Sequence, residues 1–231
     1  MSSEAGGGAF RTGTLARTHV DQPGLPRGAS SLGREAVVAA QRERVLRAVI
    51  SVAAEGYAKA TVAEVVRRAR VSRSVFYEHF ADKETCFLAG CAQGVELMFD
   101  RIAAGVRAVG RSATAAERAE ASLHAYLQFL IDEPEFAACF LVEAFAAGPP
   151  AIAQVAAVQG RFAENERRWH AKARREQASL PPVPVAVHHA MVGAIHQLVL
   201  DQVRAGRTAD LLAVEDVAAR LHTAIYSGWP T

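Results

Sequence analysis

Residues 61–83 have the sequence TVAEVVRRARVSRSVFYEHFADK. Thr61 is followed three residues later by Glu64, which is the spacing of a capping box, so a helix is predicted to begin at Thr61. Ser72 is a good N-cap residue for a second helix, and only two residues separate it from the end of the first. Two short helices joined by so tight a turn have the layout of a helix-turn-helix, in which the second helix enters the DNA major groove.

The apolar residues around this stretch predict a compact three-helix head. Upstream, residues 41–55 carry an apolar stripe at helical spacing, and Gly56 stands where a helix stop is expected. The second helix of the motif has its own apolar side. The residues predicted to fill the small core beneath it are Val71, Val75, Phe76 and Phe80.

Residues 41–90 resemble the N-terminal domain of the TetR family of transcriptional repressors. The resemblance rests on the threonine-led helix, on the turn Ala69-Arg70-Val71-Ser72, and on the run from Tyr77 to Lys83, YEHFADK. Arg70 departs from the family pattern, which has glycine at this position. A non-glycine residue with positive φ costs about 1 kcal/mol, so the turn is expected to be mildly strained or slightly rearranged.

The resemblance implies a set of DNA contacts. The residues that correspond to base-facing positions are Arg73, Ser74, Val75, Glu78 and His79. Those that correspond to positions holding the DNA backbone are Thr61, Ser72, Tyr77 and Lys83. The alternative for Tyr77 and His79 is packing within the head, and for Arg73 it is a solvated surface position.

The charge distribution is consistent with a DNA-binding head but is not sufficient to predict one. Residues 1–90 hold 13 Lys and Arg against 9 Asp and Glu, and residues 91–231 hold 13 against 15. A basic reading end and a faintly acidic remainder suit a DNA-binding protein with a separate partner domain. The excess is small, so the prediction depends on the motif.

Composition excludes other classes of protein. Of the 231 residues, 51% are hydrophobic, with abundant alanine and few β-branched runs, which favours an all-α fold. No run of eighteen apolar residues occurs, so no membrane span is expected. The N-terminus lacks the layout of a signal peptide, which predicts a cytoplasmic protein.

Cysteine and histidine spacing gives no metal or cofactor site. Cys86, Cys91 and Cys139 have neither disulfide nor metal spacing and are expected to be reduced thiols, with a thiol sensor as the alternative. His189 and His196 are seven residues apart, whereas a metal pair on a helix needs a spacing of about three or four. We therefore expect no metal and no cofactor.

Glycine and proline punctuation divides the chain into three parts. We expect residues 1–34 to be a disordered N-terminal extension, 35–82 the helix-turn-helix DNA-binding domain, and 83–231 a helical effector-binding and dimerisation domain. The helices predicted after the head cover residues 82–107, 114–131, 135–146, 151–178, 185–205 and 211–226. Arginines in the extension either contact a neighbouring groove or belong to a solvated leader.

The last two predicted helices are candidates for the association surface of a homodimer. Their apolar stripes consist of Val192, Ile195, Val199 and Val203, and of Leu211, Val214, Val217, Leu221 and Ile225. The resemblance implies that this helix pair meets its copy across a two-fold axis as a four-helix bundle, which matches a palindromic site. The alternative is that the stripes pack within the monomer.

The large side chains of the middle helices predict an apolar ligand pocket. The residues expected to line it are Phe99, Tyr126, Phe129, Phe140, Phe162, Trp169 and His188. For any single aromatic residue, an ordinary core position is the alternative.

The hypothesis drawn from the sequence is a homodimeric repressor that a small hydrophobic effector releases from a palindromic operator. One alternative is a ligand-independent DNA-binding regulator controlled by a protein partner. The other is an all-helical enzyme, but the sequence offers no phosphate loop, nucleophile motif or carboxylate pair. The chain is therefore predicted not to be an enzyme.

Overall fold

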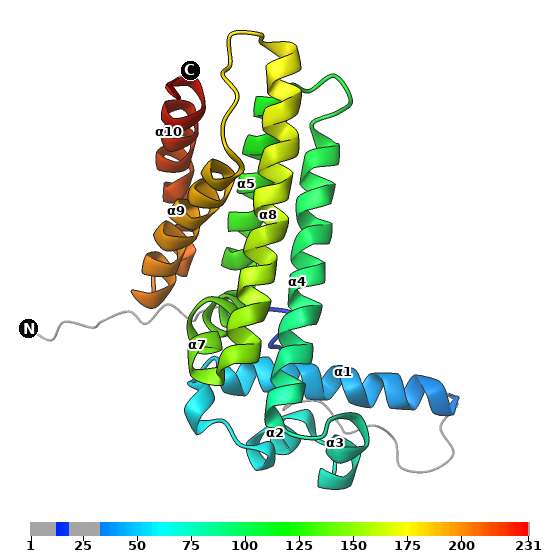
Figure 1. The fold of residues 1–231 in the computed structure, drawn as a ribbon. Helices are drawn as coiled ribbons and strands as arrows, with labels where there is room; N and C mark the ends of the chain where they lie inside the picture. The colour runs from blue at the N-terminus through cyan, green and yellow to red at the C-terminus, as the bar shows by residue number, and fades with distance from the viewer. Residues whose placement is uncertain (1–12, 19–32, 231) are drawn as a thin grey trace, which may run out of the picture.

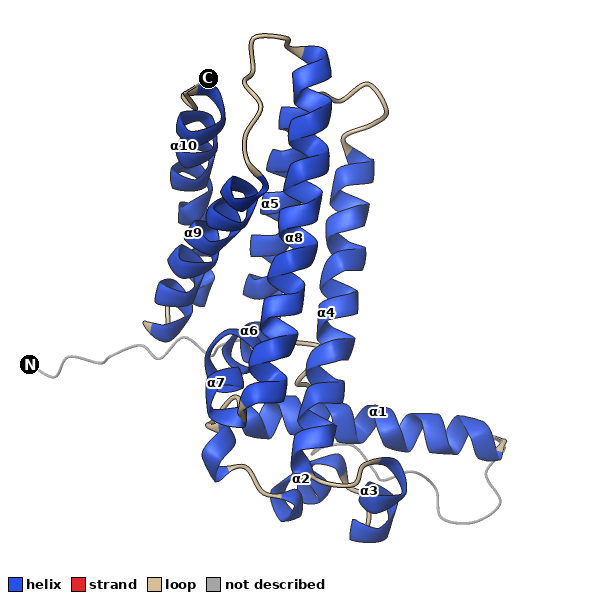
Figure 2. Ribbon diagram, viewed as in Figure 1, coloured by secondary structure: helices blue, strands red, loops and turns tan. Residues whose placement is uncertain are grey.

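A computed structural model of the chain describes residues 13–18 and 33–230 (Figure 1). No strand occurs within these ranges, which confirms the all-α prediction (Figure 2). The helices are α1 Arg34–Ala53, α2 Val62–Ala69, α3 Arg73–His79, α4 Lys83–Ala108, α5 Ala115–Asp132, α6 Pro134–Ala137, α7 Ala144–Ala147, α8 Pro149–Glu176, α9 Val185–Arg204 and α10 Val214–Ser227. Two 3₁₀ segments, η1 Tyr57–Lys59 and η3 Thr208–Ala213, and one π-helical segment, η2 Ala138–Glu143, complete the described part.

Side-chain caps fix the helix starts in the head. The Thr61 hydroxyl accepts a hydrogen bond from the Glu64 amide, and Ser72 accepts one from the Val75 amide, both at 3.2 Å. Asp82 caps α4 in the same way, with its carboxylate 2.7 Å from the Thr85 amide. These three predicted helix starts are confirmed, because each cap satisfies an otherwise unpaired N–H at a helix N-terminus.

Only half of the predicted capping box at Thr61 forms. The Glu64 carboxylate accepts hydrogen bonds from Arg67 and Arg68, at distances of 2.6 to 2.9 Å. These two guanidinium groups outcompete the Thr61 amide for the carboxylate, and the hydrogen bond from Arg67 is the largest cause that lowers the Glu64 pKa to about 2. A complete capping box is found instead at Thr114, at the start of α5.

The turn between α2 and α3 keeps the left-handed geometry of a glycine turn. Arg70 has φ 54° and ψ 44°, and it is the one non-glycine residue with positive φ in the part of the chain that is described. The turn is therefore strained, by about 1 kcal/mol, and not rearranged.

Three long helices form the body of the second domain. α4, α5 and α8 run side by side away from the head, and α9 and α10 cover one side of them (Figure 1). α4 begins in the head, against α1, and ends at the far end of the body. The core is continuous from the buried face of α1 to the α5–α8 interface.

The predicted helix over residues 135–146 is interrupted. Its middle part, Ala138–Glu143, has the wider π-helical hydrogen bonding between the short helices α6 and α7. A π-turn inserts one extra residue and rotates the side chains that follow, and such insertions are frequent at functional sites. Sequence periodicity does not predict this, since the apolar pattern of the segment also fits a regular helix.

Part of the N-terminal extension is ordered, which corrects the prediction for residues 1–34. The amides of Thr14 and Leu15 donate to the buried Glu133 carboxylate at 3.0 and 2.8 Å, and the Gly13 amide donates to Glu135 at 3.0 Å. The Leu15 side chain is buried as well. Residues 1–12 and 19–32 of the extension lie outside the described residues.

The stripes assigned to a dimer surface lie partly inside the monomer. Val199 and Val203 of α9, Leu211 of η3 and Val214 of α10 are buried in the core of their own chain. This corrects the prediction for these four residues, because a side chain already covered within the chain is not available to a second copy.

Candidate nucleic-acid interface and effector cavity

α3 presents a polar outer face and is held by an apolar inner face. Phe76 is fully buried, whereas Arg73, Ser74 and Glu78 are exposed. Tyr77 is 48% exposed, and the Arg73 guanidinium lies 5.7 Å from the centre of its ring. This face carries the donors and acceptors that reading base edges requires.

The hydroxyl groups at the start of α3 are also accessible. The Ser72 and Ser74 hydroxyl oxygens lie 2.8 Å apart, and both residues are exposed. Thr61 at the start of α2 is exposed too. Exposed hydroxyls next to two helix N-termini suit phosphate oxygens.

Three residues of the predicted DNA-contact set have other contacts. Val75 is half-buried, and His79 is half-buried with its Nε2 covered by protein, so one ring nitrogen of His79 is withdrawn from DNA. The Lys83 ammonium donates to the Tyr57 carbonyl at 3.0 Å and lies 4.1 Å from the Tyr57 ring centre. In this structure Lys83 joins α4 to η1 and does not project as a free phosphate-binding group.

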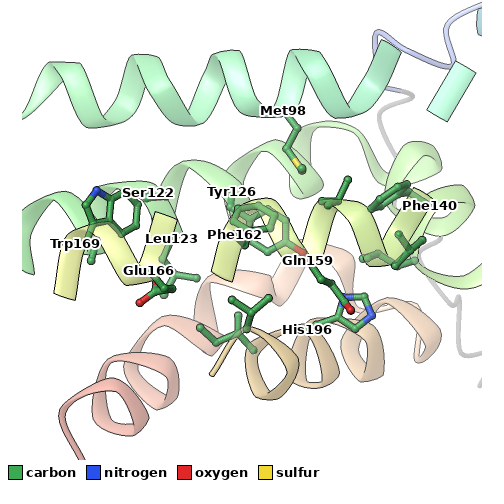
Figure 3. A pocket seen from close by; sticks show the side chains of 16 residues that line it. Met98, Ser122, Leu123, Tyr126, Phe140, Gln159, Phe162, Glu166, Trp169 and His196 are labelled. Carbon is green, nitrogen blue, oxygen red and sulfur yellow. The ribbon is translucent and has the colours of Figure 1, made fainter. Parts of the chain in front are cut away.

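A cavity of about 70 Å³ lies among α4, α5, the π-helical segment, α8 and α9 (Figure 3). Its lining is mainly aliphatic and aromatic. It contains four of the seven residues predicted for the pocket, namely Tyr126, Phe140, Phe162 and Trp169. The side chains of Tyr126 and Phe162 pack edge to face, with ring centres 5.3 Å apart.

The other three predicted residues lie elsewhere. Phe99 packs on the outer side of Phe162 and is covered by the Arg161 guanidinium, 3.7 Å from its ring centre. Phe129 is buried against Phe136. His188 is buried beside α10, where its Nδ1 lies 2.8 Å from the Tyr226 hydroxyl. The sequence does not distinguish these three residues from those that line the cavity, because all of them are large side chains on the same helices. Only the tertiary arrangement does.

Polar residues of the lining were missed by the sequence analysis. They are Ser122, Gln159, Glu166 and His196. Glu166 could have been found, since it is four residues after Phe162 and three before Trp169 and therefore shares their face of α8. Figure 3 shows it among the side chains that project from this helix toward the cavity.

The cysteine thiols do not have the properties of a sensor. Cys86, Cys91 and Cys139 are buried, and burial raises the pKa of all three, that of Cys86 to about 12. A reactive thiol needs a lowered pKa and access to solvent, so the thiol-sensor alternative is unsupported. Within residues 13–18 and 33–230, no group of three His, Cys, Asp or Glu side chains is placed to hold a metal ion.

Comparison with known proteins agrees with this geometry. Residues 47–89 match the model of the family described as bacterial regulatory proteins, tetR family. No curated protein matches the chain in sequence. None of the helices in the described part has both the length and the apolarity to span a bilayer.

Solved structures of regulators share the fold over most of the chain. FadR from Bacillus subtilis, in complex with stearoyl-CoA, superposes with a TM-score of 0.68 at 16% identity and covers 81% of this chain and 98% of its own. The fatty acid degradation regulator FadR from Bacillus halodurans gives 0.66 at 17% identity, covering 84% and 96%. A tetR-family regulatory protein from Rhodococcus RHA1 gives 0.62 at 21% identity, covering 78% and 96%.

The helix-turn-helix head and the helical second domain define a DNA-binding transcriptional regulator. Residues 47–89 match the DNA-binding domain of the TetR family, and the described part of the chain has the fold of TetR-family regulators. The prediction that it is a regulator and not an enzyme is confirmed by the same comparisons.

Proposed function

We propose that the protein is a homodimeric repressor that binds a palindromic operator through α3 and releases it when a small hydrophobic effector occupies the cavity. The observation that carries this proposal is the path of α4. The helix begins at its Asp82 cap in the head, and Met98 on the same helix lines the cavity. At 1.5 Å per residue, about 24 Å of continuous helix joins the two sites.

A continuous helix transmits a change of position from one end to the other. An effector that fits only one pose of α4 would alter the separation of the two heads in a dimer. Half-sites on DNA are spaced by about 34–36 Å or a multiple of it, so a dimer with altered spacing loses one half-site. Coupling of this kind is typically worth about 1–3 kcal/mol.

The proposed DNA contacts follow the exposed face of α3. We assign base contacts to Arg73, Ser74 and Glu78, and backbone contacts to Thr61, Ser72 and Tyr77. Val75, His79 and Lys83 remain proposed DNA contacts. Val75 and His79 are half-buried, and Lys83 would first have to leave the Tyr57 carbonyl. We keep the domain limits at residues 35–82 and 83–231, and we place the protein in the cytoplasm, where its DNA target would be.

The proposed dimer surface is the outer face of α9 and α10. Ala186, Ala190 and Gly193 are exposed on α9, and a side chain added at Gly193 would meet no atom within 4 Å in the described part of the monomer. Val217 on α10 is 45% exposed. Small residues at such a face allow a helix from a second copy to approach closely. A Gly193→Arg variant that elutes as a monomer while the wild type elutes as a dimer would support this assignment.

The effector part of the proposal has support from the cavity and from the neighbours. The lining is mainly apolar, and two neighbours are FadR proteins, one of them bound to stearoyl-CoA. The volume of about 70 Å³ is small, however, so an effector must displace side chains to enter. This small volume favours the second candidate, a ligand-independent DNA-binding regulator controlled by a protein partner.

An operator-binding assay separates these two candidates. DNA flanking the gene is searched for an inverted repeat, and binding of the full chain to that duplex is measured with and without decyltrimethylammonium or 1-decanol at a concentration that saturates the cavity. Effector control predicts a loss of operator affinity of about 1–3 kcal/mol. If the operator affinity is unchanged when the cavity is saturated with either probe, the result favours the ligand-independent regulator.

A further inference from the structure

The charge of the cavity lining is one-sided. Of the described residues that line the cavity, Glu166 is the one with a formal charge, and neither lysine nor arginine is among them. Burial lowers the pKa of His196, the histidine of the lining, so this imidazole is neutral at pH 7. The lining therefore presents a carboxylate without a cationic side chain.

The Glu166 side chain is largely withdrawn from water. Its side chain is 14% exposed, and its Oε2 atom is covered by protein. The Nε2 atom of His222 lies within ion-pair distance of Oε2, at 3.3 Å, without hydrogen-bond geometry. The Tyr226 hydroxyl also approaches this carboxylate, and burial together with the charge of Glu166 raises the pKa of Tyr226. A buried carboxylate oxygen in this state is stabilised by any ligand that brings a positive charge or a donor to it.

A groove next to the cavity extends the negative charge. It has a volume of about 350 Å³ and runs between α5, α8, α9 and α10, and Glu166 and Leu123 line both spaces. The other acidic residues of the groove are Glu120, Glu215 and Asp216. Glu215 pairs with His124 at 2.7 Å, Asp216 with Arg220 at 2.9 Å and Glu166 with His222 at 3.3 Å, and of these three partners only Arg220 is permanently charged.

Aromatic rings stand on both sides of Glu166 along α8. Phe162 and Trp169 share its helix face, and Figure 3 shows the three side chains in sequence along the cavity, with Tyr126 beside Phe162. The faces of aromatic rings attract cations, tryptophan most strongly. A carboxylate flanked by rings is a recognition site for an alkylated ammonium group, because the rings bind its methyl groups and the carboxylate binds its charge.

We propose that the effector is a cationic amphiphile, whose ammonium group pairs with Glu166 and whose apolar body occupies the cavity. This inference rests on the proposed function, which assigns the cavity to an effector. The proposed ligand class differs from that of the structural neighbour FadR from Bacillus subtilis, which is bound to stearoyl-CoA. The phosphates of an acyl-CoA placed at this end would face Glu166 and Glu120, and the described residues of the lining include no lysine or arginine to receive them.

The test compares ligands that share a ten-carbon chain and differ in head group. Decyltrimethylammonium, 1-decanol, decanoate and decanoyl-CoA are titrated below their micelle concentrations into the full chain carrying Trp229→Phe, so that Trp169 is the remaining tryptophan and reports on the cavity. The ammonium ligand is expected to bind at least tenfold more tightly than the other three. Tighter binding of decanoate or decanoyl-CoA would overturn the proposal.

Glu166→Gln keeps the shape of the side chain and removes its charge. This variant is expected to lose at least tenfold in affinity for decyltrimethylammonium and to bind 1-decanol as before. The matched control is Glu164→Gln on the same helix, since Glu164 is 40% exposed and paired with Arg167 and Arg168 outside the cavity. Preference for the ammonium ligand that survives in Glu166→Gln would overturn the assignment of Glu166.

The same titrations distinguish this inference from the proposed function. If the ammonium ligand binds in a Glu166-dependent manner and operator affinity does not change, the binding site stands and effector control fails. If 1-decanol and decyltrimethylammonium bind equally and both release DNA, effector control stands and the cationic ligand class is wrong.

Discussion

The carboxylate of Glu143 accepts a hydrogen bond from the backbone N–H of Tyr57, with 2.7 Å between the two atoms. Tyr57 begins η1 in the DNA-binding head, and Glu143 ends the π-helical segment that also carries Phe140 of the cavity wall. The carbonyl of Tyr57 accepts from Lys83 at 3.0 Å. The backbone of Tyr57 is thus held by the cavity wall on one side and by α4 on the other.

Removing the Glu143 carboxylate should weaken this connection. Glu143→Ala leaves the partly buried Tyr57 N–H without its charged acceptor, which is expected to cost about 1.5–3 kcal/mol in the free energy of unfolding. Urea unfolding measures the loss. Glu143→Gln keeps an acceptor oxygen and should lose less.

The Glu143→Ala variant should also respond less to an effector. A ligand that releases the operator from the wild type is expected to change the operator affinity of the variant by a smaller factor, because one of the two connections is gone. Wild-type stability together with a wild-type response would show that the contact carries neither folding energy nor coupling.

The strained turn at Arg70 makes a second prediction. Arg70→Val should be less stable than Arg70→Asn by about 1–2 kcal/mol, since a β-branched residue fits the left-handed region poorly and asparagine tolerates it. Both variants lose the guanidinium, so their difference isolates the backbone. Thermal unfolding measures it, and equal melting temperatures would mean that the turn relaxes away from positive φ.

Two buried histidines predict a loss of stability in acid. Burial is the largest cause that lowers the pKa of His170 and His188 below the ordinary 6.5. The unfolded chain therefore binds protons that the folded chain does not, so the stability contribution is complete above pH 6.5 and is lost as the pH falls toward the folded pKa values.

His188→Asn should reduce this acid sensitivity. The amide of asparagine does not titrate and keeps a polar group near the Tyr226 hydroxyl, which lies 2.8 Å from Nδ1 of His188. Between about pH 7.5 and about pH 5, the melting temperature of the variant is expected to fall less than that of the wild type. A parallel fall in both proteins would assign the pH dependence to other groups.

The contact between the N-terminal segment and Glu133 makes a further prediction. A Cβ atom added at Gly13 would lie 2.8 Å from the Cα atom of Glu133, so Gly13→Ala should detach residues 13–16. Hydrogen exchange at the Thr14 and Leu15 amides should then become faster.

Gly33→Ala is the control for this change, because a Cβ at Gly33 meets no atom within 4 Å in the described structure. Slow exchange at Thr14 and Leu15 that persists in Gly13→Ala would contradict the contact.

Features set by local interactions were predictable from the sequence. The caps at Thr61, Ser72 and Asp82 each use a side chain and an amide three residues apart, so the sequence contains both partners. The left-handed residue at Arg70 was predictable from its place in the turn. Proline and glycine located the later helix ends to within a few residues, for the same reason.

Features set by tertiary packing were not predictable. The apolar stripe of α9 supplies both Val199 in the monomer core and Ile195 in the cavity wall, and periodicity does not separate these faces. The carboxylate of Glu64 could bind either the Thr61 amide or the Arg67 and Arg68 guanidinium groups, and the sequence does not predict which of these is preferred. The binding of residues 13–16 to Glu133 joins segments about 120 residues apart, with no local signal in either.

The contact assigned to Arg73 tests the reading of DNA by α3. Arg73→Ala should weaken binding to the operator by about 1–3 kcal/mol and relax the preference at one base position, because the guanidinium would no longer reach a base edge. Lys83→Ala should instead lower protein stability, since Lys83 is bonded to the Tyr57 carbonyl. Unaltered base preference in Arg73→Ala would remove Arg73 from the base contacts.

The central claim is that a two-fold pair of heads recognises a DNA sequence. Fluorescence anisotropy of the full chain is titrated against a labelled inverted repeat from the flanking DNA and against a scrambled duplex of the same length, at one salt concentration. The inverted repeat should bind at least about 10³-fold more tightly than the scrambled duplex. Equal affinity for the two duplexes, or no binding to either at low salt, would contradict the account.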